Sequence, residues 1–175
     1  MPLARLAKIA SAFLLGFGII MLVSIDDIAA ASKKEEAKKY TDQLKKAKAT
    51  DVKGRLEAIR KLGELGQIQY GYTEEAIPEI IKATEDKDAT IRAAAARSIG
   101  MIGVEDKAGV MALTKLLKDS NESVKFAAVE GLGYMNDKAT SSLGDLRAIR
   151  KNLDKKDKLA KAIDNAVKAI SGKKK

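Results

Sequence analysis

The chain of 175 residues has no cysteine, no histidine and no tryptophan, and these absences exclude several kinds of site. Without cysteine there is no disulfide, no thiolate metal site, no cysteine nucleophile and no lipid-modified N-terminal cysteine. Without histidine the chain lacks the commonest general base and the commonest metal ligand. A glycine-rich phosphate-binding loop is also missing from the sequence. These absences predict a non-enzymatic protein with no metal site and no cofactor.

Aromatic residues make up only 4% of the chain, whereas hydrophobic residues make up 46%. That hydrophobic content is enough for a folded core and excludes a wholly disordered chain. A core with so few aromatic side chains must be thin and aliphatic. Such a core suits closely packed helices better than a β-sandwich or barrel, whose strands favour β-branched and aromatic residues. We therefore expect an all-α fold.

The formal net charge of +9 is concentrated at the two ends of the chain. Residues 33–48 hold seven lysines against three acidic residues, and residues 150–175 hold ten basic residues against three acidic ones. Residues 50–149 hold 14 basic and 16 acidic residues, so this middle part is nearly neutral. The lysine-rich ends have two interpretations: they keep the protein soluble, or they contact a polyanion or an anionic membrane surface.

A sixteen-residue pattern occurs three times, at residues 51–66, 88–103 and 121–136, with starts 37 and then 33 residues apart. Each copy opens on aspartate or asparagine, has a cation at its fifth position and closes on an apolar–glycine–any–apolar run. The cations are Arg55, Arg92 and Lys125, and the glycines are Gly63, Gly100 and Gly133. A period of about 35 residues is typical of stacked helical repeats. The glycines are expected to let neighbouring helices approach closely.

Apolar residues at helical spacing lie between these copies, so each copy is expected to be the second helix of a helix pair. The predicted pairs span residues 33–66, 73–103, 106–136 and 138–171. The glycine motif is lost in the last pair, as is common in a terminal repeat. The predicted fold is a right-handed α-solenoid of about four helix pairs, built from residues 32–172 and followed by a basic tail at 173–175.

Three local features of the first two pairs carry further expectations. Gly66 is expected to end the helix of the first copy. Residues 67–72 then form a loop in which Tyr70 and Tyr72 either pack over the start of the next helix or offer an exposed aromatic contact. Pro78, in the early part of that next helix, is expected to kink it.

The pattern resembles HEAT repeats, in particular the short HEAT-like repeats of the family named after phycobilisome lyases. In that family an aspartate precedes a second helix that carries a Val-Arg or Val-Lys pair, and the first helix often contains a proline. The matching positions are Pro78, Asp86, Ile91, Arg92, Asp119, Val124 and Lys125. The first pair departs from the pattern at Ala49 and Gly54, and the fourth has Asn152 in place of the aspartate. The resemblance implies a ladder of charge pairs between adjacent repeats, which we interpret as structural, formed by Asp86, Arg92, Asp119 and Lys125.

Residues 1–31 have the three-part layout of a secretory signal peptide. A short basic start precedes an uncharged stretch at 9–25, and an Ala-x-Ala site follows at Ala29 and Ala31. We expect cleavage after Ala31. The alternative is an uncleaved anchor, because 17 uncharged residues lie at the short end of the range that spans a bilayer. Both interpretations export the repeats, to the periplasm or the cell envelope.

The second helices of a right-handed stack line its concave face, so their outward side chains are candidates for binding a partner. The partner-binding residues predicted there are Arg60, Glu64, Arg97, Met101, Glu130 and Tyr134. Small residues beside them are expected to form an apolar centre within this charged rim, an arrangement that holds a helical partner in a groove. These are Ala94, Ser98, Ala127 and Gly131. The alternative is a merely solvated face whose alanines favour helix formation.

Together these features predict an exported interaction scaffold that binds a protein partner along the concave face. The alternative function is that of a polyanion or membrane-surface binder that uses the lysine-rich ends. Nucleic acid is not expected as a partner of an exported protein. Bilin lyase chemistry, which occurs among HEAT-like proteins, suits neither an exported protein nor these residues.

Overall fold

The computed structural model describes residues 24–104 and 107–172, and every regular element in them is a helix. The chain divides into two compact units, residues 1–30 and 31–175. Most of the predicted signal peptide and the predicted basic tail therefore lie outside the described residues. Within those residues, no helix is both long and apolar enough to span a bilayer.

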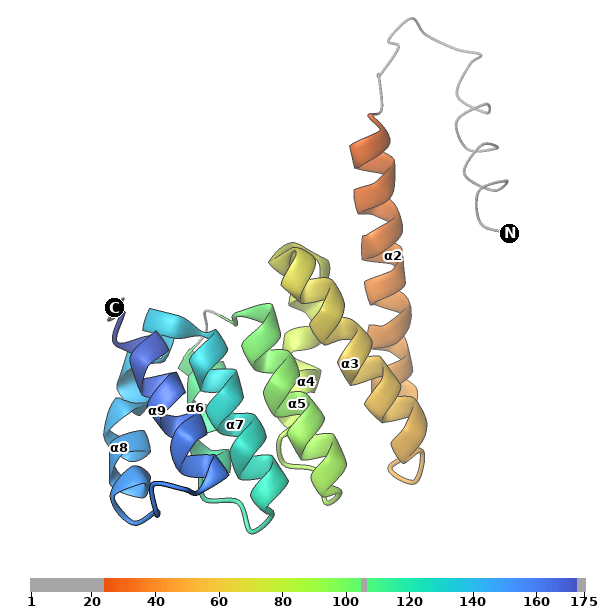
Figure 1. Cartoon of the computed structure of the whole chain (residues 1–175). Coiled ribbons are helices and arrows are strands. Elements are labelled where there is room, and N and C mark those ends of the chain that lie inside the picture. The colour runs from red at the N-terminus through yellow and green to blue at the C-terminus, as the bar shows by residue number, and fades with distance from the viewer. Residues whose placement is uncertain (1–23, 105–106, 173–175) are drawn as a thin grey trace, which may run out of the picture. The chain divides into compact units, whose positions relative to one another are not determined.

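Eight α-helices and three short 3₁₀ helices make up the described part of the chain (Figure 1). The α-helices are α2 (Ile25–Lys46), α3 (Val52–Ile68), α4 (Ile77–Ala83), α5 (Ala89–Ile102), α6 (Lys107–Leu116), α7 (Glu122–Tyr134), α8 (Leu143–Lys151) and α9 (Lys158–Ile170). The 3₁₀ helices are η1 (Tyr70–Tyr72), η2 (Glu74–Ala76) and η3 (Asn136–Ser142). The helices follow one another as four pairs, which confirms the predicted all-α solenoid.

The helix pairs stack in two layers. The second helices α3, α5, α7 and α9 pack against one another in sequence order and form what we call the B layer (Figure 1). The first helices α4, α6 and α8 lie behind them and each packs against its own partner. Contacts between successive helices are closer in the B layer than among the first helices, so the B layer is the more tightly packed side.

The core is the aliphatic one that the sequence predicts, because apolar residues three and four apart share one side of each helix. On α5 the buried line is Ile91, Ala95, Ile99 and Ile102, and the equivalent line in the next repeat is Val124, Ala128, Leu132 and Met135. Every one of these side chains is buried. The last helix continues the line with Leu159, Ile163 and Ile170.

The residue that opens each copy of the repeated pattern is a helix N-cap. Asp51 accepts a hydrogen bond from the Gly54 amide, and Asp88 accepts one from the Thr90 amide. Asn121 does the same for two amides at the start of α7. These side chains satisfy backbone donors that have no partner inside the helix, so the recurring aspartate or asparagine fixes where each B-layer helix begins.

Glycine allows the closest approach in the B layer. A Cβ atom on Gly100 would lie 2.4 Å from the Cα atom of Gly131, so α5 and α7 touch backbone to backbone at this point. A Cβ atom on Gly63 would lie 2.6 Å from the Ser98 hydroxyl oxygen of α5. Gly133 is different, because a Cβ atom there would make an ordinary contact of 3.4 Å with Ala166. The predicted close approach thus holds at Gly63 and Gly100, and only loosely at Gly133.

Two expectations about helix ends are wrong. Gly66 does not end α3, which continues to Ile68; instead, a Cβ atom on Gly66 would lie 2.6 Å from Ile102, so this glycine too is a close helix contact. Pro78 does not kink a helix, because η2 ends before it and α4 begins at Ile77, which places proline in the first turn, where its missing N–H is harmless. Of the two tyrosines, Tyr72 packs against the core, whereas Tyr70 is 37% exposed.

Helix α2 begins earlier than the sequence suggests. The first predicted helix pair begins at residue 33, whereas α2 runs from Ile25 to Lys46 and passes through the predicted cleavage site. Ser24 and Asp27 explain the early start, because each accepts a hydrogen bond from the backbone amide of the other. Side-chain burial begins only at Ala37, and none of residues 24–36 is buried.

Candidate partner-binding surface

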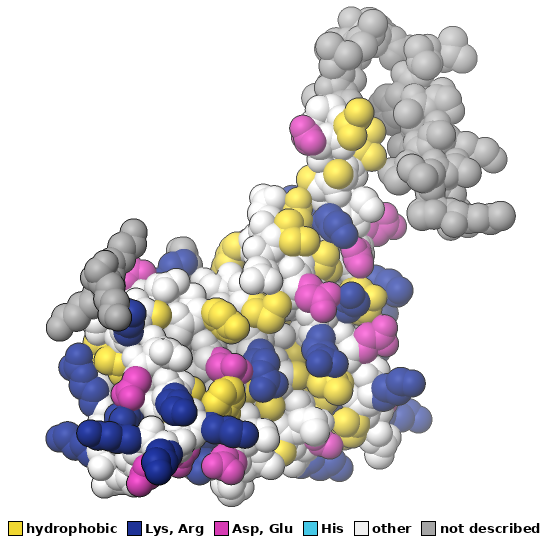
Figure 2. Space-filling model, viewed as in Figure 1, with side chains coloured by type: hydrophobic (Ala, Val, Ile, Leu, Met, Phe, Trp, Pro, Cys, Tyr) yellow, Lys and Arg dark blue, Asp and Glu magenta, His cyan; other side chains and the backbone are white. Residues whose placement is uncertain are grey.

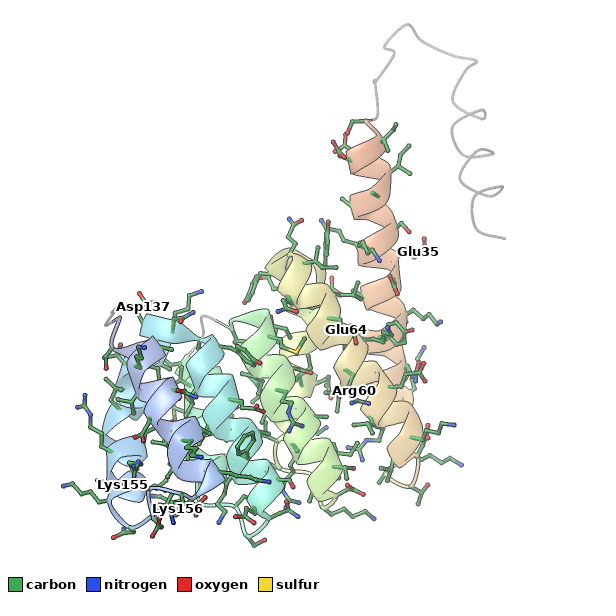
Figure 3. The ribbon with its side chains drawn as sticks, in the orientation of Figure 1. Glu35, Arg60, Glu64, Asp137, Lys155 and Lys156 are labelled. Atoms are coloured by element: carbon green, nitrogen blue, oxygen red, sulfur yellow. The ribbon has the colours of Figure 1, made fainter. Side chains whose placement is uncertain are left out.

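The six predicted partner-binding residues lie in two rows across three neighbouring B-layer helices. Successive copies of the pattern place Arg60, Arg97 and Glu130 at equivalent positions, and Glu64, Met101 and Tyr134 one turn further along. Because α3, α5 and α7 pack in this order, each row crosses from helix to helix. Figure 3 labels Arg60 and Glu64 on α3, at the beginning of the two rows.

Three of the four charged residues of this surface are already engaged in ion pairs. Arg97 donates from Nε to the Glu130 carboxylate at 3.2 Å, which links α5 to α7. The Glu64 carboxylate accepts from Lys61 at 2.8 Å, and this contact raises the pKa of Lys61. Arg60 is exposed and forms no ion pair with any residue that the structure describes. These are surface interactions, so they shape the surface more than they stabilise the fold.

Two large apolar side chains interrupt the charges. Tyr134 is 58% exposed at the end of α7, and Met101, its equivalent on α5, is half-buried. In Figure 2, which views the molecule from the B-layer side, hydrophobic side chains are scattered among basic and acidic ones. The face is therefore mixed in character, with apolar points between charges.

The small residues that were predicted to form an exposed apolar centre are not exposed. Ala94, Ser98, Ala127 and Gly131 are all buried between B-layer helices. Ser98 donates its hydroxyl proton to the Ile59 carbonyl at 2.9 Å, and so ties α5 to α3. Small residues at these positions let the helices close on one another, and for this reason they are unavailable to a partner.

The predicted charge ladder residues lie at the turns that lead into the B-layer helices. Arg92 donates to both carboxylate oxygens of Asp119, at 2.7 and 2.9 Å, and to the backbone carbonyl of Asp86 at 2.8 Å. The side chains of Arg92 and Asp119 are 15% and 9% exposed, so this pair between repeats is largely shielded from water. Such a bidentate pair is stronger than an ordinary ion pair.

Asp86 pairs with Arg55 of the preceding repeat, a residue that the predicted ladder omitted. Both side chains are largely buried. Arg55 stands at the same fifth position as Arg92, and this shared position is the sequence signal that could have identified it. The rule is therefore that the arginine of one repeat reaches the aspartate of the next repeat.

Lys125 is the third cation in this series. The sequence pattern aligns Asn152 with Asp86 and Asp119, but the structural counterpart of those two residues is Asp154. All three aspartates lie three residues after the first helix of a pair ends, and each accepts a hydrogen bond from the backbone amide two residues further on. Asn152 is the last residue of the α8 turn, and its amide donates to the Ala148 carbonyl. Within the described residues, Lys125 forms no ion pair within 4 Å. The ladder thus has two charged steps and ends before the last helix pair.

The charge pairs shift the acidity of the two carboxyls in the same direction. Hydrogen bonds from Arg92 lower the pKa of Asp119 below its ordinary value of 3.8, against the opposing effect of burial. Burial is the largest influence on Asp86 and acts to raise its pKa, but hydrogen bonds from Arg55 and the Asp88 amide outweigh it and leave the pKa lowered. Both carboxylates are therefore held in the charged form.

Two clefts that no sequence pattern predicted lie beside α2. One, of about 440 Å³, lies among the C-terminal end of α2, the start of α3 and α4, and contains the Arg55–Asp86 pair. The other, of about 320 Å³, lies between α2 and the segment at 71–75. Both are lined by lysines and glutamates together. Across the described residues, no group of three or more acidic side chains is arranged to hold a metal ion.

Comparison with known proteins supports HEAT-type repeats in this chain. Residues 41–111, from α2 to the middle of α6, match the sequence model of HEAT repeats. The crystal structure of an engineered protein, a Northeast Structural Genomics Consortium target, resembles the chain with a TM-score of 0.58 and 21% identity. This likeness covers 78% of the present chain and 67% of the other, and at such identity it shows the fold alone. No curated protein matches the chain.

Proposed function

We propose that this chain is an exported, non-enzymatic scaffold that binds a protein partner along the exposed face of its B layer. The observation that carries the proposal is the pair Met101 and Tyr134, which occupy equivalent positions on neighbouring helices. Tyrosine is enriched where proteins bind one another, because its ring is apolar and its hydroxyl can form a hydrogen bond. Charged residues surround the pair, as they surround the apolar points of many transient interfaces.

The charges around these points favour a helical partner with an acidic residue. Arg97 and Glu130 already neutralise each other, whereas Arg60 has no acidic partner within the described residues. A partner helix that lays apolar residues over Met101 and Tyr134 could place a carboxylate against Arg60. Such a contact would fix the orientation of the partner helix but would add little affinity, because it lies at the exposed rim of the surface.

Export of the protein, to the periplasm or cell envelope, is part of the same proposal. It rests on the layout of residues 1–31 and is supported by the absence of buried side chains at 24–36. Cleavage after Ala31 would remove two turns of α2 and no part of the core. We also propose that the repeats are of the short phycobilisome-lyase type. This part of the proposal concerns the fold only and does not include bilin lyase activity.

A photo-crosslinking amino acid placed at position 101 or 134 tests the surface directly. The matched control is position 111, because Met111 is also an exposed methionine, 70% exposed, but lies on α6 outside the B layer. The variants would be expressed in the native cells and irradiated. We expect one defined protein to be captured at 101 and 134, to be absent at 111, and to remain at high salt.

Substitution then decides whether the captured protein uses this surface. Tyr134→Glu and Arg97→Glu should abolish the crosslink at position 101 without changing the helical circular dichroism spectrum. Equal capture at 111, or unchanged capture in both folded variants, would show that the B-layer face is not the binding site.

A further inference from the structure

The C-terminal end of the helix array carries a group of exposed lysines that form no ion pair within the described part of the chain. Six lysines, all exposed, lie on α8, on the α8–α9 turn and on α9, and we call them the basic end: Lys151, Lys155, Lys156, Lys158, Lys161 and Lys168. Figure 2 shows basic side chains gathered over α8 and α9, and Figure 3 labels Lys155 and Lys156 in the turn between them.

The acidic residues among these lysines are occupied by other groups. Asp157 caps α9 and accepts from the Leu159 amide at 2.7 Å, and Asp154 accepts from the Lys156 amide at 2.8 Å. Asp164 accepts from Arg150 at 2.8 Å. None of the six lysines of the basic end forms an ion pair with a residue that the structure describes, so their ammonium groups remain available.

The lysines of α2 provide a contrast within the same chain. Lys33 pairs with Glu36 and Lys46 with Asp42, both on their own helix, and Lys39 lies 5.1 Å from the centre of the Tyr40 ring. Acidic residues are interspersed along α2, as Glu35 in Figure 3 illustrates. The two lysine-rich ends of the sequence thus differ: several lysines of α2 are engaged within their own helix, whereas none of the six at the basic end forms an ion pair with a described residue.

We propose that the basic end binds an anionic lipid surface. Lys158, Lys161 and Lys168 fall within about 80° of one another around α9, so they present their charges to one plane. Lysine is a compact point charge that suits a layer of headgroups, whereas shaped phosphate recognition favours the fork of arginine, and Arg150 is already occupied by Asp164. The basic end also contains no aromatic side chain on which a base could stack.

The mode of binding follows from the packing of α9. Its apolar residues Leu159, Ile163 and Ile170 are buried in the array and cannot enter a bilayer. The contact is therefore electrostatic, rests on top of the headgroups and requires both anionic lipid and low salt. It is independent of the proposed partner surface, which lies on α3, α5 and α7.

Co-sedimentation of the full chain with lipid vesicles tests this inference. One set of vesicles contains phosphatidylcholine and phosphatidylglycerol in equal parts, and the other contains phosphatidylcholine alone. The test variant carries Lys155→Gln, Lys156→Gln and Lys161→Gln, and the matched control carries Lys34→Gln, Lys38→Gln and Lys45→Gln on α2. Both variants lose three charges, and both must keep the circular dichroism spectrum of the parent.

We expect the parent and the α2 control to bind anionic vesicles alike and to be released by salt, whereas the test variant binds roughly a hundredfold more weakly, from about fivefold for each lysine. If both variants lost vesicle affinity equally, the binding would depend on the net charge of the protein and not on the basic end, and the inference would be overturned. Binding unaffected by the three C-terminal substitutions would overturn it as well. Retention on inorganic polyphosphate through the same lysines, without vesicle binding, would show that the ligand is a soluble polyanion instead.

Discussion

The contact between α5 and α7 and the contact between α7 and α9 are equivalent places in the repeat, and they are built differently. At the first, Gly100 meets Gly131 backbone to backbone, and Arg92 pairs with Asp119. At the second, Gly133 makes an ordinary contact with Ala166, and Lys125 forms no ion pair with a residue that the structure describes.

The difference shows what the sequence pattern specifies. The cation and the glycine of each copy act on the following repeat, and the aspartate receives the cation of the preceding one. Where the chain approaches its last helix pair, these features weaken together. The repeated residues are thus the means by which one helix pair recognises the next, and they leave the outer face of the B layer free to vary, as it does from Glu64 to Met101 to Tyr134.

Substitution of Gly100 and of its equivalent Gly133 should show the largest difference in stability between the two contacts. Gly100→Ala places a Cβ atom against the Gly131 backbone, which cannot move aside easily, so we expect a loss of about 3 kcal/mol in the free energy of unfolding. Gly133→Ala meets only ordinary contact and gains about 1 kcal/mol of helix propensity, so it should be neutral or slightly stabilising. Urea unfolding followed by circular dichroism measures both. Equal losses would contradict the difference between the contacts.

Removal of the charge at Asp119 should have the next largest effect. Asp119→Asn leaves the shielded Arg92 without its carboxylate, and we expect a loss of about 2 kcal/mol near neutral pH. The pKa of Asp119 is lowered in the folded protein, so its contribution is present above the ordinary value of 3.8 and is lost as the pH falls below it. The gap between parent and variant should therefore narrow in acid.

Asp137→Asn is the matched control for that experiment. Asp137, labelled in Figure 3, is exposed, and its carboxylate takes part in no ion pair with a described residue. It should leave stability unchanged throughout the same titration. A gap between parent and Asp119→Asn that stays constant down to strong acid would rule out the ion pair as its cause.

Completion of the missing step should strengthen the weaker contact by a smaller amount. Asp154 is the structural counterpart of Asp86 and Asp119, so Lys125→Arg supplies the guanidinium that reaches this aspartate in the other two repeats. Because Asp154 is exposed, we expect a gain of only about 0.5–1 kcal/mol. Lys125→Arg combined with Asp154→Asn should give none, and thermal unfolding of the single and double variants tests whether the gain belongs to the pair. A full gain in the double variant would count against a new ion pair.

Truncation to residues 32–175 should have the smallest effect. It takes away residues that are not buried and leaves both helix contacts intact, so the free energy of unfolding should change by less than about 0.5 kcal/mol. The measurement is urea unfolding of the full and truncated chains. A large loss would mean that the first two turns of α2 stabilise the fold through interactions that its exposed side chains do not suggest.

The repeat period and the apolar spacing were sufficient to predict the fold class, the aliphatic core and the succession of about four helix pairs. The prediction for Gly66 was wrong because a glycine near a helix end can have two roles. It can end the helix, or it can allow a neighbouring helix to pack closely, and the local sequence does not distinguish between them. Pro78 was misplaced for a similar reason: the 3₁₀ turn before α4 depends on tertiary packing that no local pattern reveals.

The candidate surface was predicted only in its outer residues. Exposure of Arg97 or Tyr134 follows from helical periodicity, which gives direction around one helix. The burial of Ala94 and Gly131 depends on how closely two helices approach, and this distance is set by the glycines of both. The early start of α2 depends on reciprocal hydrogen bonds between Ser24 and Asp27. The sequence did not indicate these bonds, because the alanines that follow them were interpreted as a cleavage site.

The forward reach of Arg92 has a consequence for the length of the array. Residues 86–118 contain one aspartate that receives an arginine from behind and one arginine that reaches ahead. A tandem duplication of this 33-residue segment would present its own aspartate to Arg92 and its own arginine to Asp119, so no joint would be left open. Evolution can therefore lengthen such a protein by whole repeats in a single genetic event.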